Sequence, residues 1–316
     1  MGTPEFAVPS LEALLHPNLE RVVQVIGVVT QPDRPKGRGQ RLMPPAIKLL
    51  AERHSLPVVQ PPKMKDPEFL DTLRRWAPDL IVVTAFGRIL PPVILDLPPK
   101  GCVNVHGSLL PKYRGAAPIQ WAIINGETET GITTMLMDPG MDTGPMLMKA
   151  SLPILPEETA GELAARLAPL GGRLLTETIR ALLEDRISPI PQDASLATLA
   201  PLLKKEDGTL DWQSEPVAVV NRVRGLTPWP GAATYYGEER WLVRRARAAG
   251  TERAEPGTVL AATNDGLQVA AGTGSVLIQE LQASSGKRLA MKQYLAGHAV
   301  MIGSKLTREP APPIAS

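Results

Sequence analysis

Cysteine is almost absent from this sequence, because Cys102 is the only one among 316 residues. A single cysteine excludes an internal disulfide, and with it the small disulfide-stapled folds of secreted proteins; it favours a reducing, cytoplasmic location. The four histidines and the cysteine show none of the spacings that are typical of a structural or catalytic zinc site. We therefore expect no bound metal.

Long apolar runs are also missing. None reaches the roughly 18 residues that a membrane-spanning helix needs, and the first residues show no charged segment followed by an apolar one, as a secretory signal would. We therefore expect no membrane partner, and we expect a monomer. Hydrophobic residues still make up 43% of the chain, and 316 residues are enough for two domains with separate cores.

No charge of one sign dominates, since the formal net charge is only +2. The distribution is more informative: residues 1–203 hold 20 basic and 21 acidic side chains, and residues 204–316 hold 14 and 11. Residues 30–48 carry five basic side chains against Asp33 alone. This basic loop is either an ordinary solvated surface or a place that attracts phosphate groups.

A dinucleotide-binding or Walker glycine pattern is absent as well. Gly37 and Gly39 have no third glycine at the required spacing and no helix directly after them, and Gly272 and Gly274 do not complete such a pattern. A sheet of Rossmann type therefore carries no prediction of NAD binding here.

Residues 101–121 contain the pattern most suggestive of chemistry. A short strand, residues 102–105, delivers Asn104 and His106 two residues apart, which places both side chains on one face of the strand end. A glycine-punctuated loop and a helix follow, the usual place for chemistry in an open α/β sheet. Asp142 lies in a second loop after another strand. By themselves, Asn104 and His106 also fit a helix cap or a turn, and an aspartate beside glycine is ordinary turn chemistry.

Four segments in the right order resemble the folate-dependent formyltransferases. They are residues 2–9 (GTPEFAVP), 30–39 (TQPDRPKGRG), 104–115 with the later 141–144 (MDTG), and 225–232 (GLTPWPGA). The first, second and last are similar in particular to the members that act on methionyl-tRNA. The resemblance implies a direct transfer of a formyl group from 10-formyltetrahydrofolate to methionyl-initiator tRNA, for translation initiation, without a covalent enzyme intermediate.

The resemblance also implies residue roles. Asn104, His106 and Asp142 are the expected catalytic residues: acyl transfer needs a hydrogen-bond donor toward the oxyanion and a base near the attacking amine. The expected folate-binding residues are Phe86, Gly87, Leu90, Ser108, Leu109, Leu110 and Pro111. The expected tRNA-binding residues are Arg34, Lys36, Arg38 and Arg41, in the basic loop. For the leucines, simple core packing is the competing interpretation.

Strands and helices alternate along residues 1–185, which predicts a Rossmann-like, mostly parallel catalytic domain. We expect strands at 22–29, 57–59, 79–84, 102–105, 131–137 and 146–152, and helices at 7–15, 45–53, 66–76, 91–95, 117–125 and 159–184. Residues 186–208, rich in proline, are the expected linker. After a helix at 216–224, five short strand-like runs within 209–316 predict a small barrel, and the resemblance implies an OB-type, tRNA-binding domain.

The beginning of the chain is unusual for this family. In the family a strand precedes the Gly2-Thr3-Pro4 turn, and here no such run does. The sheet then lacks a central strand, which would expose two strand edges, or translation begins upstream of Met1. We favour the upstream start.

Two other functions fit parts of the sequence. A related formyltransferase acting on a small amine would need the same folate chemistry, but neither the basic loop nor a C-terminal barrel. A non-catalytic tRNA-binding protein would need those two features, but not Asn104, His106 and Asp142 together.

Overall fold

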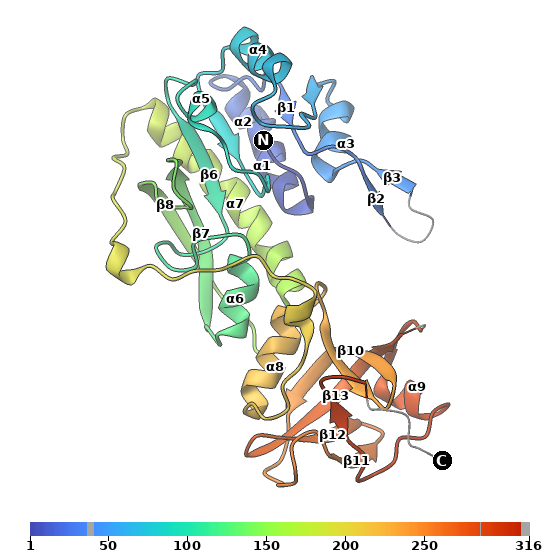
Figure 1. Cartoon of the computed structure of the whole chain (residues 1–316). Coiled ribbons are helices and arrows are strands. Elements are labelled where there is room, and N and C mark those ends of the chain that lie inside the picture. The colour runs from blue at the N-terminus through green and yellow to red at the C-terminus, as the bar shows by residue number, and fades with distance from the viewer. Residues whose placement is uncertain (37–40, 285, 311–316) are drawn as a thin grey trace. The chain divides into compact units, whose positions relative to one another are not determined.

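The structure is a computed structural model that describes residues 1–36, 41–284 and 286–310 (Figure 1). The chain divides into two compact units. The first comprises Met1–Pro118, Glu129–Leu152 and Ala164–Pro201, and the second comprises Ile119–Thr128, Pro153–Leu163 and Leu202–Ser316. Among the described residues, no helix has the length and apolar character needed to cross a membrane.

The first unit is built on two groups of strands. One is a four-stranded sheet in the order β5-β6-β7-β8, and the other is the parallel pair β1-β4. The bounds are β1 Val28–Val29, β4 Val58–Val59, β5 Ile81–Val83, β6 Cys102–His106, β7 Glu129–Leu136 and β8 Met146–Pro153. The expected parallel order is found for β1 with β4 and β5 with β6, whereas β7 runs antiparallel to β6. The chain enters β7 at the same end of the sheet at which it leaves β6, so β7 runs back in the opposite direction.

Helices of the first unit form where apolar residues recur at helical spacing. In α4 (Pro67–Trp76), Asp66 caps the first turn by accepting hydrogen bonds from the backbone N–H groups of Glu68 and Phe69. The long helix α7 (Ala160–Leu183) contacts β7 through a 2.8 Å hydrogen bond between the buried hydroxyls of Thr134 and Thr178. The remaining helices are η1 Glu5–Ala7, α1 Val8–Leu14, α2 Pro17–Glu20, α3 Ala46–Arg53, α5 Pro92–Leu95 and the short turn η2 Ala194–Leu196, while α6 (Pro118–Ile124) belongs to the second unit from Ile119 onward.

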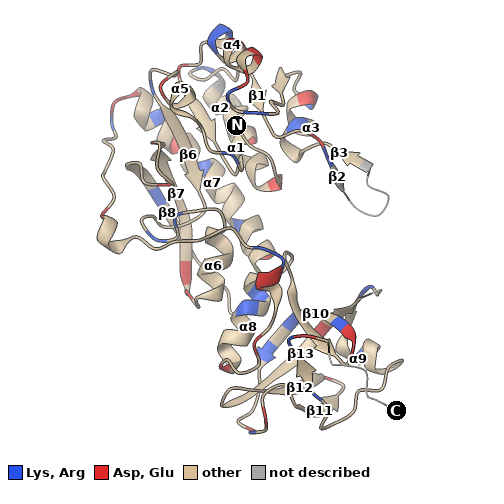
Figure 2. Cartoon of the chain, viewed as in Figure 1, with Lys and Arg blue, Asp and Glu red and all other residues tan. Residues whose placement is uncertain are grey.

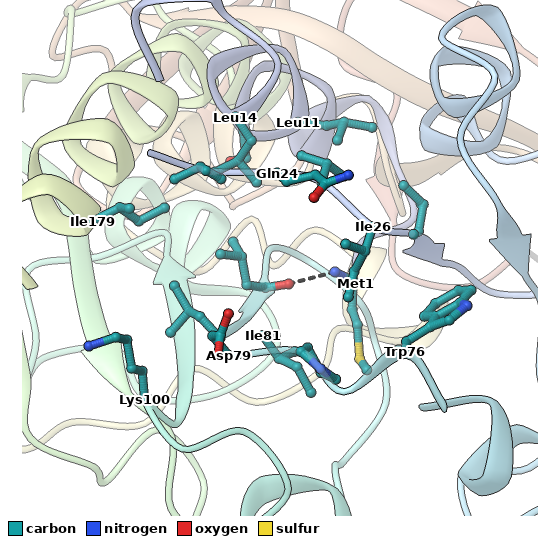
Figure 3. Close-up of a pocket in the computed structure, with 18 of the residues that line it drawn as sticks. Met1, Leu11, Leu14, Gln24, Ile26, Trp76, Asp79, Ile81, Lys100 and Ile179 are labelled. Carbon is teal, nitrogen blue, oxygen red and sulfur yellow. Dashed lines mark hydrogen bonds between the residues drawn. The ribbon is translucent and has the colours of Figure 1, made fainter. Parts of the chain in front are cut away.

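The expected strand over residues 22–29 shortens to the two residues of β1. A cavity of about 440 Å³ lies between residues 22–28 and residues 79–84 (Figure 3). Its walls are mostly apolar and include Leu11, Ile26, Trp76 and Ile179. Among the described residues, β1 pairs with β4 only at Val28 and Val29, so the hydrogen-bond ladder does not extend back over residues 22–27.

Met1 and Gly2 lie at one end of this cavity and pair with both walls. The amino group of Met1 donates to the carbonyl of Val82, Thr84 N–H donates to the Met1 carbonyl, and Gly2 N–H donates to the Val29 carbonyl. Gly2 bridges Thr84 in the parallel direction. The backbone of Gly27 and Leu80 makes no backbone hydrogen bond within the part of the chain that the structure describes. Met1 and Gly2 therefore occupy the end of a strand position between β1 and β5.

A short antiparallel hairpin stands where a loop was expected. Its strands are β2 (Arg34–Lys36) and β3 (Arg41–Met43), with Arg34 opposite Met43. At its base, the Lys48 ammonium forms a 2.9 Å ion pair with Asp33. Hydrogen bonds from Gln60 and Lys48 lower the pKa of Asp33. The charge of Lys48 is therefore balanced by Asp33, and the excess of basic residues in this region lies in the hairpin.

The second unit contains an antiparallel sheet in the order β11-β12-β13-β10-β9-β15, with β14 beside β13, so it is an antiparallel half-barrel. The bounds are β9 Ala232–Tyr236, β10 Glu239–Ala248, β11 Val259–Thr263, β12 Gly266–Ala271, β13 Gly274–Ala283, β14 Arg288–Ala290 and β15 Leu306–Thr307, with helices η3 Glu206–Gly208, α8 Pro216–Gly225 and α9 Met291–Leu295. All five expected strand runs are confirmed. Trp241 is fully buried and stacks on Tyr236 at 5.1 Å between ring centroids.

Candidate active site

The end of β6 carries the two polar residues that the sequence singled out. All five residues of β6 are buried, because the strand is paired on both sides, by β5 and β7. Asn104 is 9% exposed and His106 is 5% exposed. Buried polar side chains need hydrogen-bond partners, and the partners of these two come from the loops that follow β6 and β7.

His106 lies between a backbone carbonyl and a carboxylate. Its Nε2 atom is 2.9 Å from the carbonyl oxygen of Tyr113, and its Nδ1 atom is 3.6 Å from Oδ2 of Asp142. A carbonyl can only accept, so Nε2 carries the hydrogen and the neutral ring presents its Nδ1 lone pair toward Asp142. A second proton on Nδ1 would convert this contact into a charge-assisted pair. The arrangement is suited to receiving a proton.

Asp142 joins the set through both of its carboxylate oxygens. Oδ1 accepts from Nδ2 of Asn104 at 3.3 Å, and Oδ2 accepts from the backbone N–H of Gly115 at 2.9 Å. Asp142 has a φ of +53°, in the left-handed region that aspartate adopts only with support. The structure therefore brings Asn104, His106 and Asp142 together, as the sequence pattern predicts.

The loop after β6 is held by buried hydroxyls. Thr133 of β7 donates from Oγ1 to the Ser108 carbonyl at 2.7 Å and accepts from the Leu110 N–H at 3.1 Å. Ser108 Oγ donates to the Lys112 carbonyl at 2.6 Å. These bonds turn the chain sharply after His106, and the Tyr113 carbonyl reaches back to the histidine ring.

The expected folate-binding residues divide into two sets. Phe86, Leu90 and Leu110 are buried, and Phe86 and Leu90 belong to a core cluster with Ile94 and Cys102. Gly87 has a φ of +72°. Leu109 and Pro111 are half-buried, so their side chains are partly available to a ligand, as the buried leucines are not.

Gln31 was not expected in the site, but it positions the loop after β5. Its Nε2 atom donates to the Phe86 carbonyl at 2.8 Å and to the Gly87 carbonyl at 3.3 Å. Its Oε1 atom accepts from Arg34 at 2.6 Å. This glutamine connects the base of the basic hairpin to the expected folate-binding loop. Its role depends on residues 55 positions apart, and no local pattern indicates it.

The expected tRNA-binding residues lie in or beside the hairpin. Arg34 is exposed and belongs to β2, as does Lys36, whereas Arg41 begins β3. Arg38 lies outside the described residues. No group of three or more His, Cys, Asp or Glu side chains within the described ranges is arranged to hold a metal ion.

Two surfaces of the first unit differ in chemistry from the cavity beside Met1. The first is the polar set around Asp142. The second is a hollow of about 460 Å³ next to the loop after β5; it is lined by Lys63, Met64, Lys65, Ile89, Leu90, Pro91, Pro92 and Pro139. Ile89 is 84% exposed there. Apolar walls with two ammonium groups at the rim are suited to a ligand that has a ring and carboxylates.

Comparison with known families matches the two parts of the chain. The Formyl transferase model matches residues 1–179, and the model for the Formyl transferase C-terminal domain matches residues 202–299. The chain belongs to the formyl transferase family.

Relatives within this family match along nearly the whole length. The Methionyl-tRNA formyltransferase of Geobacter sulfurreducens is 54% identical over 306 residues, covering 97% of this chain and 95% of the relative. The Methionyl-tRNA formyltransferase of Acetivibrio thermocellus is 50% identical over 308 residues, covering 97% and 98%.

Solved structures share the fold at low sequence identity. The sugar 3N-formyl transferase WlaRD superposes with a TM-score of 0.63 at 16% identity, covering 90% of this chain and 97% of that one. HypX from Aquifex aeolicus, solved with tetrahydrofolic acid, gives a TM-score of 0.60 at 18% identity and covers 92% of this chain and 50% of that one.

Proposed function

We propose that this protein transfers the formyl group of 10-formyltetrahydrofolate to the free amino group of methionyl-initiator tRNA, for translation initiation. The observation that carries the proposal is the contact of one carboxylate, Asp142, with both polar residues at the end of β6, Asn104 and His106. Relatives named Methionyl-tRNA formyltransferase support the choice of acceptor, because they match over 95% or more of their own length at about half identity.

The chemistry is acyl transfer, in which the amine attacks the formyl carbon and a tetrahedral intermediate with an oxyanion forms. The amine then loses a proton, the folate N10 atom gains one, and the carbon–nitrogen bond to N10 breaks. Asn104 donates from its amide toward the oxyanion, and Nδ1 of His106, which faces Asp142, is placed to take up and release a proton. Asp142 orients His106, and together they take the proton that leaves the amine and pass it to the departing N10 atom. In the absence of an activated nucleophile at the site, transfer is direct.

The folate is held, in this proposal, by the loop after β5 and the loop after β6. The half-buried Leu109 and Pro111 and the backbone of Phe86, Gly87 and Leu90 provide one wall, while Ser108 and Leu110 shape the loop from within. The hollow beside Leu90 continues this wall, and its Lys63 and Lys65 ammonium groups suit the carboxylates of a folate tail.

The tRNA is held, in this proposal, by basic side chains on both units. Arg34, Lys36, Arg38 and Arg41 of the hairpin region supply one cluster. The second unit, which we assign to the OB type, supplies another on β10, where the ribbon in Figure 2 is blue at the positions of its arginines. Burial, with Arg288 and Arg240 nearby, lowers the pKa of Arg244. A phosphate group beside these like charges would relieve their repulsion.

Two arginines of β10 are already used within the second unit. Arg244 donates to the Pro228 carbonyl and to Gln282, and Arg245 forms an ion pair with Glu162. Arg247 is exposed, whereas Arg240, Arg244 and Arg245 of the same strand are half-buried. We assign phosphate binding on this strand first to Arg247.

The proposal is tested by supplying the protein with formyl-labelled 10-formyltetrahydrofolate and one acceptor at a time. The acceptors are methionyl-initiator tRNA, methionyl-elongator tRNA and small amines that include a nucleotide-linked amino sugar. Label recovered as N-formylmethionine on the initiator tRNA supports the proposal. Label found only on a small amine would replace it with the small-amine function, and tRNA binding without label transfer would replace it with a non-catalytic role.

A further inference from the structure

Residues 190–200, which the sequence predicts as part of a linker, are bound to the loops of the candidate active site. We call residues 190–200 the strap. At its start, Ile190 exchanges two 2.8 Å backbone hydrogen bonds with Met146, at the beginning of β8. At its end, Ala200 N–H donates to the Arg114 carbonyl at 2.7 Å and the Ala200 carbonyl accepts from Ala117 N–H at 3.1 Å. The strap is therefore anchored on both sides of Asp142.

Gln192, near the start of the strap, forms hydrogen bonds with the turn that contains Asp142. Its Nε2 atom donates to the Asp142 carbonyl at 2.8 Å and to the Gly144 carbonyl at 2.7 Å. Its Oε1 atom accepts from Arg114, at 3.0 Å from Nε and 2.8 Å from Nη2. One side chain thus uses both ends of its amide, and it links the turn of Asp142 to the loop that follows His106.

Asp142 needs such external support because its backbone is in the left-handed region, with a φ of +53°. A non-glycine residue keeps this conformation only where the surroundings fix it. The carboxylate is held by Asn104 and Gly115, but these bonds do not fix the backbone that carries it. The two hydrogen bonds from Gln192 act directly on that backbone, in addition to the bonds that the Asp138 carboxylate accepts from Gly140 N–H and Thr143 Oγ1.

The strap also determines where the Gly115 N–H points. A Cβ added to Gly115 would lie 2.6 Å from the Ala200 carbonyl oxygen, and Gly115 has a φ of +125°. The backbone approach of strap and loop therefore requires glycine. Two residues before Gly115, the Tyr113 N–H donates to Thr198 Oγ1 at 2.9 Å. The carbonyl of the same residue, Tyr113, faces His106.

We infer that the strap is a positioning device for formyl transfer, in which Gln192 holds Asp142 in register with His106 and Gly115. This inference rests on the proposed function for its catalytic consequence, although the positioning itself does not. Gln192 touches no reacting atom and acts through Asp142. A displacement of the carboxylate by about 1 Å is enough to lower the rate by roughly 10²-fold in a site that works by orientation.

The test uses the full-length protein with Gln192→Glu, Gln192→Leu and the control Ser195→Ala. Gln192→Glu keeps an acceptor for Arg114, so the bonds to Arg114 remain. It replaces the donor that faces the Asp142 and Gly144 carbonyls by a carboxylate oxygen, so the bonds to these two carbonyls are lost. Gln192→Leu removes both. Ser195 is exposed on the same strap and donates to the Asp193 carboxylate, so its substitution leaves the hydrogen bonds of Gln192 intact.

Two readouts separate the positioning from the reaction. Amide hydrogen exchange at Gly115 reports the bond to Asp142 without any substrate, and kinetics report catalysis. For both Gln192 variants we expect Gly115 exchange to accelerate about tenfold or more, kcat to fall roughly 10- to 10²-fold, and KM for tRNA and folate to stay within about twofold. Ser195→Ala is expected to match wild type in both readouts.

Unchanged Gly115 exchange in both Gln192 variants overturns the inference, whatever the activity. A rise in KM for tRNA with kcat unchanged also overturns it, because the strap would then act as a tether. Faster Gly115 exchange combined with a wild-type protein that formylates no acceptor refutes the proposed function and leaves the positioning role standing.

Discussion

Each ring nitrogen of His106 has a partner in the site. The carbonyl of Tyr113 fixes the hydrogen on Nε2, and the carboxylate of Asp142 faces the other nitrogen. Nδ1 of His106 and Oδ2 of Asp142 are 3.6 Å apart, so a proton can be held between these two atoms. This geometry matches the need of acyl transfer, in which a proton leaves the amine as charge grows on the carbonyl oxygen.

Substitution of the three site residues is expected to affect catalysis more than folding. Asn104→Ala, His106→Ala and Asp142→Ala should each lower kcat for formylation by roughly 10²- to 10⁴-fold, because each removes a donor or the group that orients it. The measurement is steady-state kinetics together with thermal unfolding of the same samples. Activity of His106→Ala within about twofold of wild type would remove this histidine from the mechanism.

At the residue scale, the sequence indicates the polar side chains that the structure brings together around Asp142, but not the side chains that hold their loops. Asn104 and His106 are recognisable because period-2 spacing at a strand end places them on one face. Gln192 and Gln31 act through hydrogen bonds to carbonyls 48 to 56 residues away. An isolated glutamine in a loop has no local pattern that would indicate such a contact.

Among the elements, β1 and β5 face each other across a cavity instead of pairing. Apolar side chains such as Leu11, Ile26 and Ile179 line this space of about 440 Å³, and side chains without packing partners on one side lose van der Waals contacts. The backbone of Gly27 and Leu80 on the two walls has no backbone partner among the described residues. Both observations favour a strand at this position.

An extension at the amino end is expected to fill this cavity. We propose that about six apolar residues fused before Met1 continue the direction of Met1 and Gly2 and pair with both walls, since a strand rises about 3.3 Å per residue. The melting temperature should rise by roughly 5 °C or more. A matched extension of six glycine and serine residues is the control, and equal melting temperatures for the two extended proteins would refute the strand assignment.

The amino group of Met1 provides a pH test of the same element. Burial is the main cause that lowers its pKa from 8.0 to about 5. Between these values the unfolded chain binds a proton that the folded chain does not, so the free energy of unfolding contributed by this group increases as pH rises from 5 to 8 and falls as pH drops.

Acetylation of that amino group should remove this part of the pH dependence. The measurement is denaturant unfolding of the 316-residue chain, with Met1 retained, across pH 5 to 8, beside the acetylated form. Because histidines titrate equally in both samples, the difference between the curves belongs to Met1. Parallel curves for the two forms would show that the amine is solvated in the folded state.

The elements that the sequence predicts well are those whose pattern is local. Helices α1, α3, α4, α7 and α8 follow apolar spacing and caps, and their ends lie within one or two residues of expectation. Strand β1 is shorter than its β-branched run because strand length depends on a neighbour that sequence does not reveal. The hairpin β2-β3 and the short strands β14 and β15 were missed, since two or three residues carry too little pattern.

For the molecule as a whole, the position of charge matters more than its total. The net charge of +2 gives no general attraction to nucleic acid. Local clusters do, because each phosphate contact releases counterions and makes binding weaken as salt rises. Clusters on both units would let the protein hold the acceptor stem while the aminoacyl end reaches Asp142.

Arg38→Ala is expected to raise KM for methionyl-initiator tRNA. It should also reduce the slope of the logarithm of tRNA affinity against the logarithm of salt concentration by about 1, the value for one phosphate contact. KM for the folate should hardly change, because the folate is assigned to other loops. Both constants are measured on one sample at two salt concentrations. If the tRNA constants match wild type and neither depends on salt, the basic hairpin is an ordinary solvated surface.

The most direct test of the central claim compares two acceptors that present the same amine. Formylation of methionyl-initiator tRNA and of methionine amide is measured with the wild-type protein under identical conditions. If binding of the tRNA body is used to bring the amine to Asn104, His106 and Asp142, kcat/KM should be higher for the tRNA by roughly 10³-fold or more. Equal kcat/KM values for the two acceptors would contradict the account, because the tRNA would then contribute nothing to the reaction.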